Sequence, residues 1–187
     1  MNETIHTILE RRSCRAYKSE QIKEEELETI LECGLRAPSA VNAQDWHFSV
    51  IQNQALITRM SVDIRDNIMP EEVVKRYTGR NGGNPDFSVF YYAPTVVMIS
   101  GKIENKYAPI NCSLAAQNMS IAAESLGVGS IIIGMAALVP ELKNGAQYVE
   151  EMQIPEGFKP IFAMCFGYKN AAPLIIEKRA GTVVRIQ

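Results

Sequence analysis

Apolar residues recur three or four positions apart in several segments of the chain, which is the spacing of one helix face. The clearest case is residues 23–36, where Leu27, Ile30, Leu31 and Leu35 share a face and glutamates crowd the first turns. Acidic residues at that end complement the positive end of the helix dipole. We predict further helices over residues 3–12, 54–79 (interrupted at Pro70), 109–126 and about 140–149.

Other segments are typical of strands. Residues 46–52 combine aromatic and β-branched side chains, and residues 95–100 form a short continuous apolar run. Such a run is typical of a strand that is buried on both faces. Residues 127–134, bounded by glycines, and residues 159–168 are further predicted strands, and residues 182–186 are a possible last one. Alternating helices and strands, with helices dominant, predict an α/β or α+β layered fold.

Length and composition indicate one globular domain over residues 1–187, with 47% hydrophobic and 21% charged residues. A chain of this size buries enough surface to fold without a metal or disulfide. The formal charge of −2 gives no overall attraction to nucleic acid or an anionic membrane, so any anion site must be local. No apolar stretch approaches the roughly 20 residues that span a bilayer, and no secretory signal is recognisable. We therefore expect a cytoplasmic protein whose four cysteines are reduced thiols.

The first segment with candidate chemistry is Arg11-Arg12-Ser13-Cys14-Arg15. Three guanidinium groups and a hydroxyl can form a compact receptor for phosphate, because arginine presents fixed N–H pairs that match phosphate oxygens. The alternative interpretation is that these arginines cap the preceding helix and carry solvated charge. Composition alone leaves both interpretations open.

Two further segments contain groups that suit a planar heterocyclic ligand. Residues 37–48 include Pro38, Ser39, Asn42 and Gln44, whose amides both donate and accept hydrogen bonds, although an ordinary turn has the same composition. Residues 127–134 contain glycines that permit close backbone approach, and the tail carries Lys178 and Arg179. The chain has no G-x-G-x-x-G after a strand, no Walker loop and no G-x-S-x-G elbow.

Taken together, these segments resemble the FMN-dependent nitroreductase family, and particularly its shorter members. The resemblance lies in RRSCRAY (residues 11–17), APSAVNAQDWHF (37–48), AAQNMSIAAESLGVGSIIIG (115–134) and IFAMCFGYKNAAP (161–173). It implies an α+β fold, a three-layer α/β/α sandwich with a central, mostly antiparallel sheet between helices. It also implies a homodimer with FMN at the subunit interface and a C-terminal segment packed on the partner.

The resemblance also assigns cofactor-binding residues. Arg11, Arg12, Ser13 and Arg15 correspond to residues that hold the FMN phosphate and the pyrimidine edge. The loop across the flavin corresponds to Pro38, Ser39, Ala40, Asn42 and Gln44, and in the family it comes from the partner subunit. Ile133 and Gly134 correspond to the backbone along the isoalloxazine, and Arg179, or its neighbour Lys178, completes the phosphate site. Asn81 or Asn84 is a further candidate for an amide contact to the ring.

The implied activity is reduction of nitroaromatic, quinone or activated-alkene acceptors by NADH or NADPH through bound FMN. Hydride transfer in two half-reactions at one open face gives a ping-pong mechanism, with no protein nucleophile and no metal. Two other functions remain open at this stage. One is a flavin-binding or flavin-storage protein without significant turnover, and the other is a non-flavin protein that binds a phosphorylated partner through residues 11–15.

Overall fold

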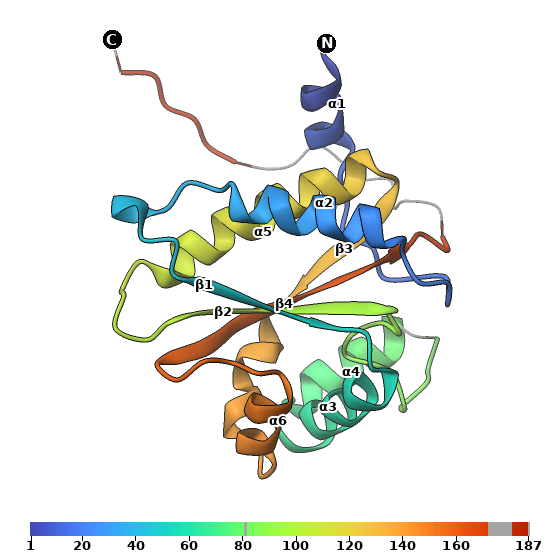
Figure 1. Ribbon diagram of the computed structural model, residues 1–187. Helices are drawn as coiled ribbons and strands as arrows, with labels where there is room; N and C mark the ends of the chain where they lie inside the picture. Colours follow the sequence, from blue (N-terminus) through green and yellow to red (C-terminus); the bar gives the residue numbers. More distant parts are fainter. Residues whose placement is uncertain (81, 172–180, 187) are drawn as a thin grey trace.

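The computed structural model describes residues 1–80, 82–171 and 181–186 (Figure 1). Its helices are α1 (Glu3–Glu10), α2 (Glu24–Leu35), α3 (Gln54–Asn67), α4 (Glu71–Arg80), α5 (Ala108–Ser125) and α6 (Gly145–Glu151). Its strands are β1 (Trp46–Ile51), β2 (Thr95–Lys102), β3 (Val128–Ile133) and β4 (Phe158–Tyr168), with 3₁₀ turns η1 (Ala40–Asn42) and η2 (Gly134–Glu141).

The strands form one antiparallel sheet in the order β1-β2-β4-β3. Helices α2 and α5 cover one face, and α3, α4 and α6 cover the other (Figure 1). The predicted α+β fold, an α/β/α sandwich around a mostly antiparallel sheet, is confirmed.

The two central strands contribute to the core on both sides of the sheet. In β2, Val96 and Met98 pack toward α3 and α4, whereas Val97 and Ile99 pack toward α2 and α5. All four side chains are fully buried. This double burial explains why residues 95–100 are a continuous apolar run rather than an alternating one.

Helix α5 is the central element of the upper layer. Ala115, Ala116 and Ala123 are fully buried in it, and Gly34 of α2 lies against Met119. Small side chains let α2, α5 and the sheet approach closely. The helix consequently contacts α2 and all four strands of the sheet.

Two predicted elements are wrong. The helix expected near residues 140–149 is divided into η2, which contains Pro140, and the short helix α6. Proline cannot donate the backbone hydrogen bond that a continuing α-helix needs, so the chain turns before α6 begins. Residues 182–186 form no strand, because no neighbouring strand pairs with them.

None of the helices among the described residues is long and apolar enough to cross a bilayer.

Candidate functional site

Residues 13–17 are attached to one edge of the sheet. Ser13 forms a parallel bridge with Ser130 of β3, and the Cys14 backbone N–H donates to the Ser130 carbonyl at 2.9 Å. Tyr17 forms an antiparallel bridge with Lys169, directly after β4. The segment that carries the arginines is therefore fixed by main-chain hydrogen bonds rather than left as a surface loop.

Gly129 permits this close attachment. A Cβ atom at residue 129 would lie 2.8 Å from both Cβ and Sγ of Cys14, and 3.0 Å from Cγ of Lys169. No real side chain fits at those distances, so glycine allows residues 13–17 to lie directly on β3.

A cavity of about 500 Å³ opens beside this segment. It is lined by Glu10, Arg12, Ser13, Cys14, Arg15, Ala16, Arg80, Glu124, Lys169 and Ala171. Four cationic side chains face two carboxylates, and Lys169 Nζ lies 2.6 Å from Glu124 Oε1. The excess positive charge, with the exposed Ser13 hydroxyl, is the donor set that a phosphate monoester requires.

The helix-capping interpretation is correct for part of this cluster. Arg12 donates from one guanidinium nitrogen to the carbonyls of Leu9 and Arg11, at the C-terminal end of α1. Arg11 is the C-cap residue, and its backbone N–H donates to the Thr7 carbonyl at 2.9 Å. Arg12 therefore combines a capping role with a place in the cavity wall, while Arg15 is exposed.

Lys169 and Arg80 are cavity residues that the sequence reasoning missed. Lys169 follows β4, and Arg80 is the last residue of α4. Both residues are far from residues 11–15 in the chain, so no local sequence pattern connects them with that segment. The GYKN segment that contains Lys169 did, however, lie within the stretch that resembles the nitroreductase family.

The cysteine in this cavity is not poised as a nucleophile. Burial raises the pKa of the Cys14 thiol, and a backbone hydrogen bond with Ala16 and the charge of Lys169 offset this only in part. Burial likewise raises the pKa of the neighbouring Tyr17 hydroxyl well above its ordinary value. Both groups stay protonated near neutral pH, so neither adds negative charge that would oppose an anion.

The second predicted set forms a strained loop at the other end of α5. Val41 (φ 51°), Asn42 (φ 56°) and Gln44 (φ 48°) all adopt left-handed backbone conformations. Each such residue costs about 1–3 kcal/mol, and a β-branched valine is an uncommon choice there. Val41 is 96% exposed, so packing against the other described residues does not stabilise it. Strain and exposure together distinguish this loop from the packed elements of the fold.

Hydrogen bonds within the loop hold that shape. The Gln44 backbone N–H donates to Ser39 Oγ at 3.0 Å, and Gln44 Nε2 donates to Asn42 Oδ1 at 2.8 Å. At the end of the loop, partial burial raises the pKa of Asp45, but hydrogen bonds from Asn111 and Asn105 lower it more. The net pKa of Asp45 lies below its ordinary value, so the residue is a carboxylate at neutral pH.

Ile133 and Gly134 lie where β3 ends, at the edge of the sheet that also carries Ser13. Ile133 is buried, whereas Gly134 is exposed and has no atom within 4 Å of the position of a Cβ. A flat ring can therefore approach the Gly134 backbone without meeting a side chain.

The structure brings some of the predicted residues together and separates others. Arg12, Ser13 and Arg15 share one cavity with Arg11 beside them, but the 38–44 loop does not line it. Ala40 is bonded to Asn111 near the start of α5, and Glu124 lies thirteen residues later, which is about 20 Å along a helix. Lys178, Arg179 and Asn81 lie outside the described residues, and Asn84 Oδ1 accepts from the Asp86 backbone N–H.

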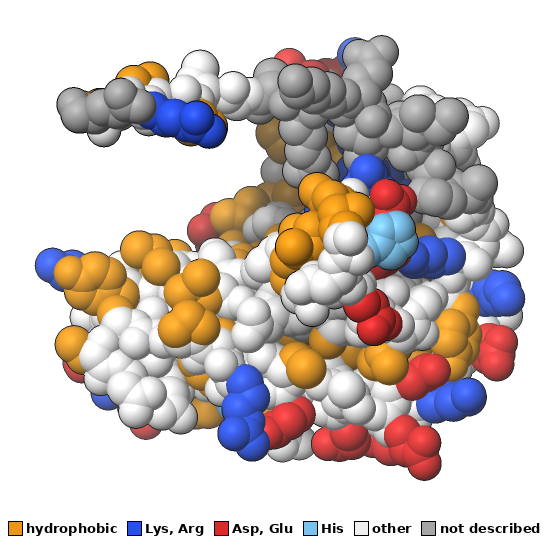
Figure 2. Space-filling model, turned by 90° about the horizontal axis from the view of Figure 1, so that it is seen from above, with side chains coloured by type: hydrophobic (Ala, Val, Ile, Leu, Met, Phe, Trp, Pro, Cys, Tyr) orange, Lys and Arg blue, Asp and Glu red, His pale blue; other side chains and the backbone are white. Residues whose placement is uncertain are grey.

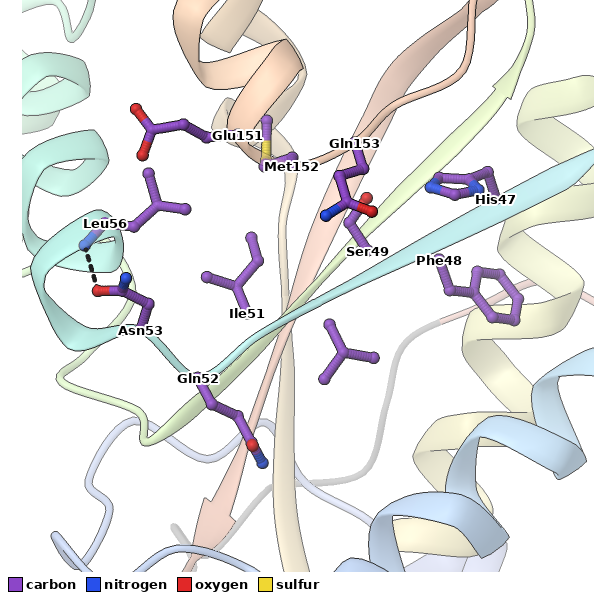
Figure 3. A pocket seen from close by; sticks show the side chains of 11 residues that line it. His47, Phe48, Ser49, Ile51, Gln52, Asn53, Leu56, Glu151, Met152 and Gln153 are labelled. Carbon is purple, nitrogen blue, oxygen red and sulfur yellow. Dashed lines mark hydrogen bonds between the residues drawn. The ribbon is translucent and has the colours of Figure 1, made fainter.

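A second cavity, of about 470 Å³, follows the outer edge of β1 (Figure 3). Figure 3 shows His47, Ser49 and Gln153 grouped beside the strand, with Glu151 and Leu56 further along. Partial burial lowers the pKa of His47 and favours the neutral imidazole. This lining provides no cation for a phosphate, so the cavity beside residues 12–16 is the better cofactor site.

Comparisons with known proteins identify the family of this chain. A model of the nitroreductase family matches residues 8–168. The chain belongs to the nitroreductase family. The resemblance stated from sequence motifs is confirmed.

Solved structures of the nitroreductase family match the whole chain. A nitroreductase with bound FMN from Bacteroides fragilis is 30% identical, with a TM-score of 0.83 and 100% of both chains covered. Another with bound FMN, from Desulfitobacterium hafniense, is 27% identical, with a TM-score of 0.86, and 99% of this chain and 100% of that chain are covered.

Curated relatives match over different lengths. An NADPH-flavin oxidoreductase from Vibrio harveyi is 26% identical over 192 residues, with 98% of this chain and 73% of that protein covered. A relative from Archaeoglobus fulgidus is 43% identical over 61 residues. That match covers 33% of this chain and only about a third of the relative, 35% of its length.

Proposed function

We propose that this nitroreductase-family chain is an FMN-dependent oxidoreductase that takes electrons from NADH or NADPH. The observation that carries the proposal is the cationic cavity held against β3 by residues 13–17. FMN-bound structures of the same fold, and a flavin oxidoreductase among the relatives, support it. Acceptors of the nitroaromatic, quinone or activated-alkene class fit a cofactor with one open face.

The residues present fit FMN. Arg11, Arg12, Ser13 and Arg15 would hold the phosphate and the pyrimidine edge, with Lys169 adding positive charge to the same cavity. Gly134 leaves room for the ring at the end of β3. Lys178 or Arg179 would complete the phosphate site.

When bound, FMN supplies hydride acceptance from the nicotinamide and hydride donation to the acceptor. The chain binds and orients the cofactor, and an arginine near the pyrimidine edge favours reduction, because negative charge develops there. The Cys14 thiol and the Tyr17 hydroxyl near this cavity stay protonated and transfer no proton in this scheme. We propose that donor and acceptor use the open face in turn, which gives ping-pong kinetics.

We further propose that the active unit is a cytoplasmic homodimer. The 38–44 loop and the cationic cavity lie at opposite ends of α5, so a second copy is needed to bring one chain's loop to the other chain's cavity. Exposed apolar side chains on the face of the molecule that carries α1, α2 and α5 support a second copy. They include Ile5, Ile8, Leu9, Leu35, Tyr107, Ile110 and Leu114. Figure 2, which views this face, shows apolar side chains gathered beside a hollow.

The cationic cavity is tested by the double variant Arg11→Ala with Arg15→Ala. Each hydrogen bond to a charged group contributes about 1.5–3 kcal/mol. We therefore expect the Kd for FMN to rise at least about a hundredfold, with the circular dichroism unchanged. Flavin fluorescence titration measures the Kd.

The control for that experiment is Lys143→Ala with Lys159→Ala, which removes the same amount of charge from exposed positions outside the cavity. Its Kd for FMN should match that of the wild type. Full flavin occupancy in the Arg11, Arg15 double variant would show that the phosphate is bound elsewhere.

A further inference from the structure

The strained 38–44 loop is tied to α5 by one buried side chain. Asn111 is fully buried in the first turn of the helix. Its Oδ1 accepts a hydrogen bond from the Ala40 backbone N–H at 3.0 Å, and its Nδ2 donates to Asp45 Oδ1 at 2.9 Å. One amide therefore joins both ends of the loop, and its donor and acceptor are both used.

Asp45 extends the network to the turn before α5. Its second carboxylate oxygen accepts from Asn105 Nδ2, and Asn105 Oδ1 accepts from the Tyr107 backbone N–H at 2.9 Å. The Asp45 carbonyl also accepts from the Lys102 backbone N–H at 3.2 Å. The carboxylate is thus held between two amides that are themselves fixed by the fold.

The loop between these two anchors has little else to hold it. Its other hydrogen bonds, between Ser39, Asn42 and Gln44 and from Ala43 to Ala40, stay within the loop. Among the hydrogen bonds of the described residues, the Ala40–Asn111 bond alone joins residues 39–44 to another element. Left-handed conformations persist only where the surrounding structure determines them.

We propose that Asn111 is a positioning residue for cofactor binding, supported by Asp45 and Asn105. It keeps the 38–44 loop in its strained conformation before FMN binds, so binding does not have to order the loop. Preorganisation of this kind strengthens binding by removing an entropic cost. The proposal rests on the proposed function, because FMN is the ligand that the loop meets.

The chain offers a matched control on the same helix. Asn118 is half-buried in α5 and donates from Nδ2 to the Cys33 carbonyl of α2 at 3.1 Å. It makes a comparable hydrogen bond that does not involve the loop. Asn118 is therefore the control for an asparagine of α5 with only a structural role, and Asn111 is the asparagine proposed to position the loop.

The test compares Asn111→Asp, Asn118→Asp and the exchange variant Asn111→Asp with Asp45→Asn in the full-length chain. Asn111→Asp places two carboxylates against each other, which repel. We expect its Kd for FMN, from flavin fluorescence, to rise at least about tenfold. The exchange variant restores a donor–acceptor pair between residues 45 and 111, and the Ala40 N–H keeps an acceptor, so its Kd should return to near the wild-type value.

Amide hydrogen exchange of residues 39–45, measured by mass spectrometry without FMN, provides the second readout. We expect faster exchange in Asn111→Asp, wild-type exchange in Asn118→Asp and recovery in the exchange variant. Should Asn111→Asp not fold, Asp45→Ala keeps the Ala40–Asn111 bond and removes the support. It should show a smaller increase in both exchange rate and Kd.

Equal Kd values for the Asn111 and Asn118 variants, or an exchange variant that stays as weak as Asn111→Asp, would overturn the proposal. So would an Asp45→Ala variant with wild-type exchange and Kd. A wild-type chain that binds no FMN would refute the proposed function instead. The exchange measurement on residues 39–45 would still decide whether Asn111 holds the loop.

Discussion

At the residue scale, two glycines have different expected roles. One allows residues 13–17 to attach to β3, and the other leaves room for the flavin ring. Gly129 lies directly under Cys14, whereas Gly134 has open space around it. Neither has a left-handed φ. Alanine at each position therefore tests spatial fit without backbone strain.

Gly129→Ala should destabilise the chain by about 1–3 kcal/mol, because the new methyl group would overlap Cys14. Gly134→Ala should change the free energy of unfolding by less than about 0.5 kcal/mol while weakening FMN binding. Urea denaturation and flavin titration measure the two effects. Identical stability of the two variants, or an unchanged FMN affinity in Gly134→Ala, would disprove these respective roles.

Several site residues were predictable because residues with the same chemical character are close together in the sequence. Arg12, Ser13 and Arg15 stand together in the chain and line one cavity. Lys169 and Arg80 join them only through tertiary contacts, which no local pattern records. The role of Asn111 was equally hidden, since an asparagine inside a helix carries no sign of its hydrogen-bond partners.

At the element scale, strongly patterned segments were predicted well. Residues 23–36 and 95–100 correspond closely to α2 and β2, because amphipathic spacing and a doubly buried run are local signals. The 140–149 helix failed at Pro140, where local backbone chemistry divides the segment. The strand expected at 182–186 depends on a pairing partner that its own sheet does not supply.

We propose that the C-terminal segment and the β1 edge are complementary surfaces of a dimer. β1 pairs with β2 alone in the sheet, and its Val50 is 41% exposed. Val183, Val184 and Ile186 are more than 80% exposed and belong to no helix or strand. The family resemblance implies that the C-terminal segment packs on the partner, and a segment with β-branched side chains can do so by adding to an open strand edge.

Truncation after Gly181 should therefore convert the dimer to a monomer and reduce FMN occupancy, while Lys178 and Arg179 remain present. Analytical ultracentrifugation measures the mass. The variant Val183→Thr with Val184→Thr, which keeps branched side chains and backbone hydrogen bonds, should remain dimeric. A truncated chain that stays dimeric with full flavin would assign the interface to other surfaces.

At the scale of the whole molecule, the near-neutral charge conceals a strongly local distribution. Cations gather in the cavity beside residues 12–16, whereas glutamates gather at the start of α2. A formal charge of −2 over the whole chain is compatible with a local pocket for one small anion. The fold explains how: residues 12–15 on the β3 edge, Arg80 at the end of α4 and Lys169 after β4 bring these cations together from distant parts of the chain.

We propose that this chain accepts hydride from a nicotinamide through bound FMN. Anaerobic stopped-flow measurement of the flavin absorbance, with NADH and NADPH added in turn to the FMN-loaded chain, tests it most directly. We predict rapid bleaching with at least one nicotinamide and recovery of the absorbance when a quinone or nitroaromatic is added. A flavin that stays oxidised with both, or bleaches too slowly for turnover, would contradict the claim and indicate a flavin-binding or flavin-storage protein.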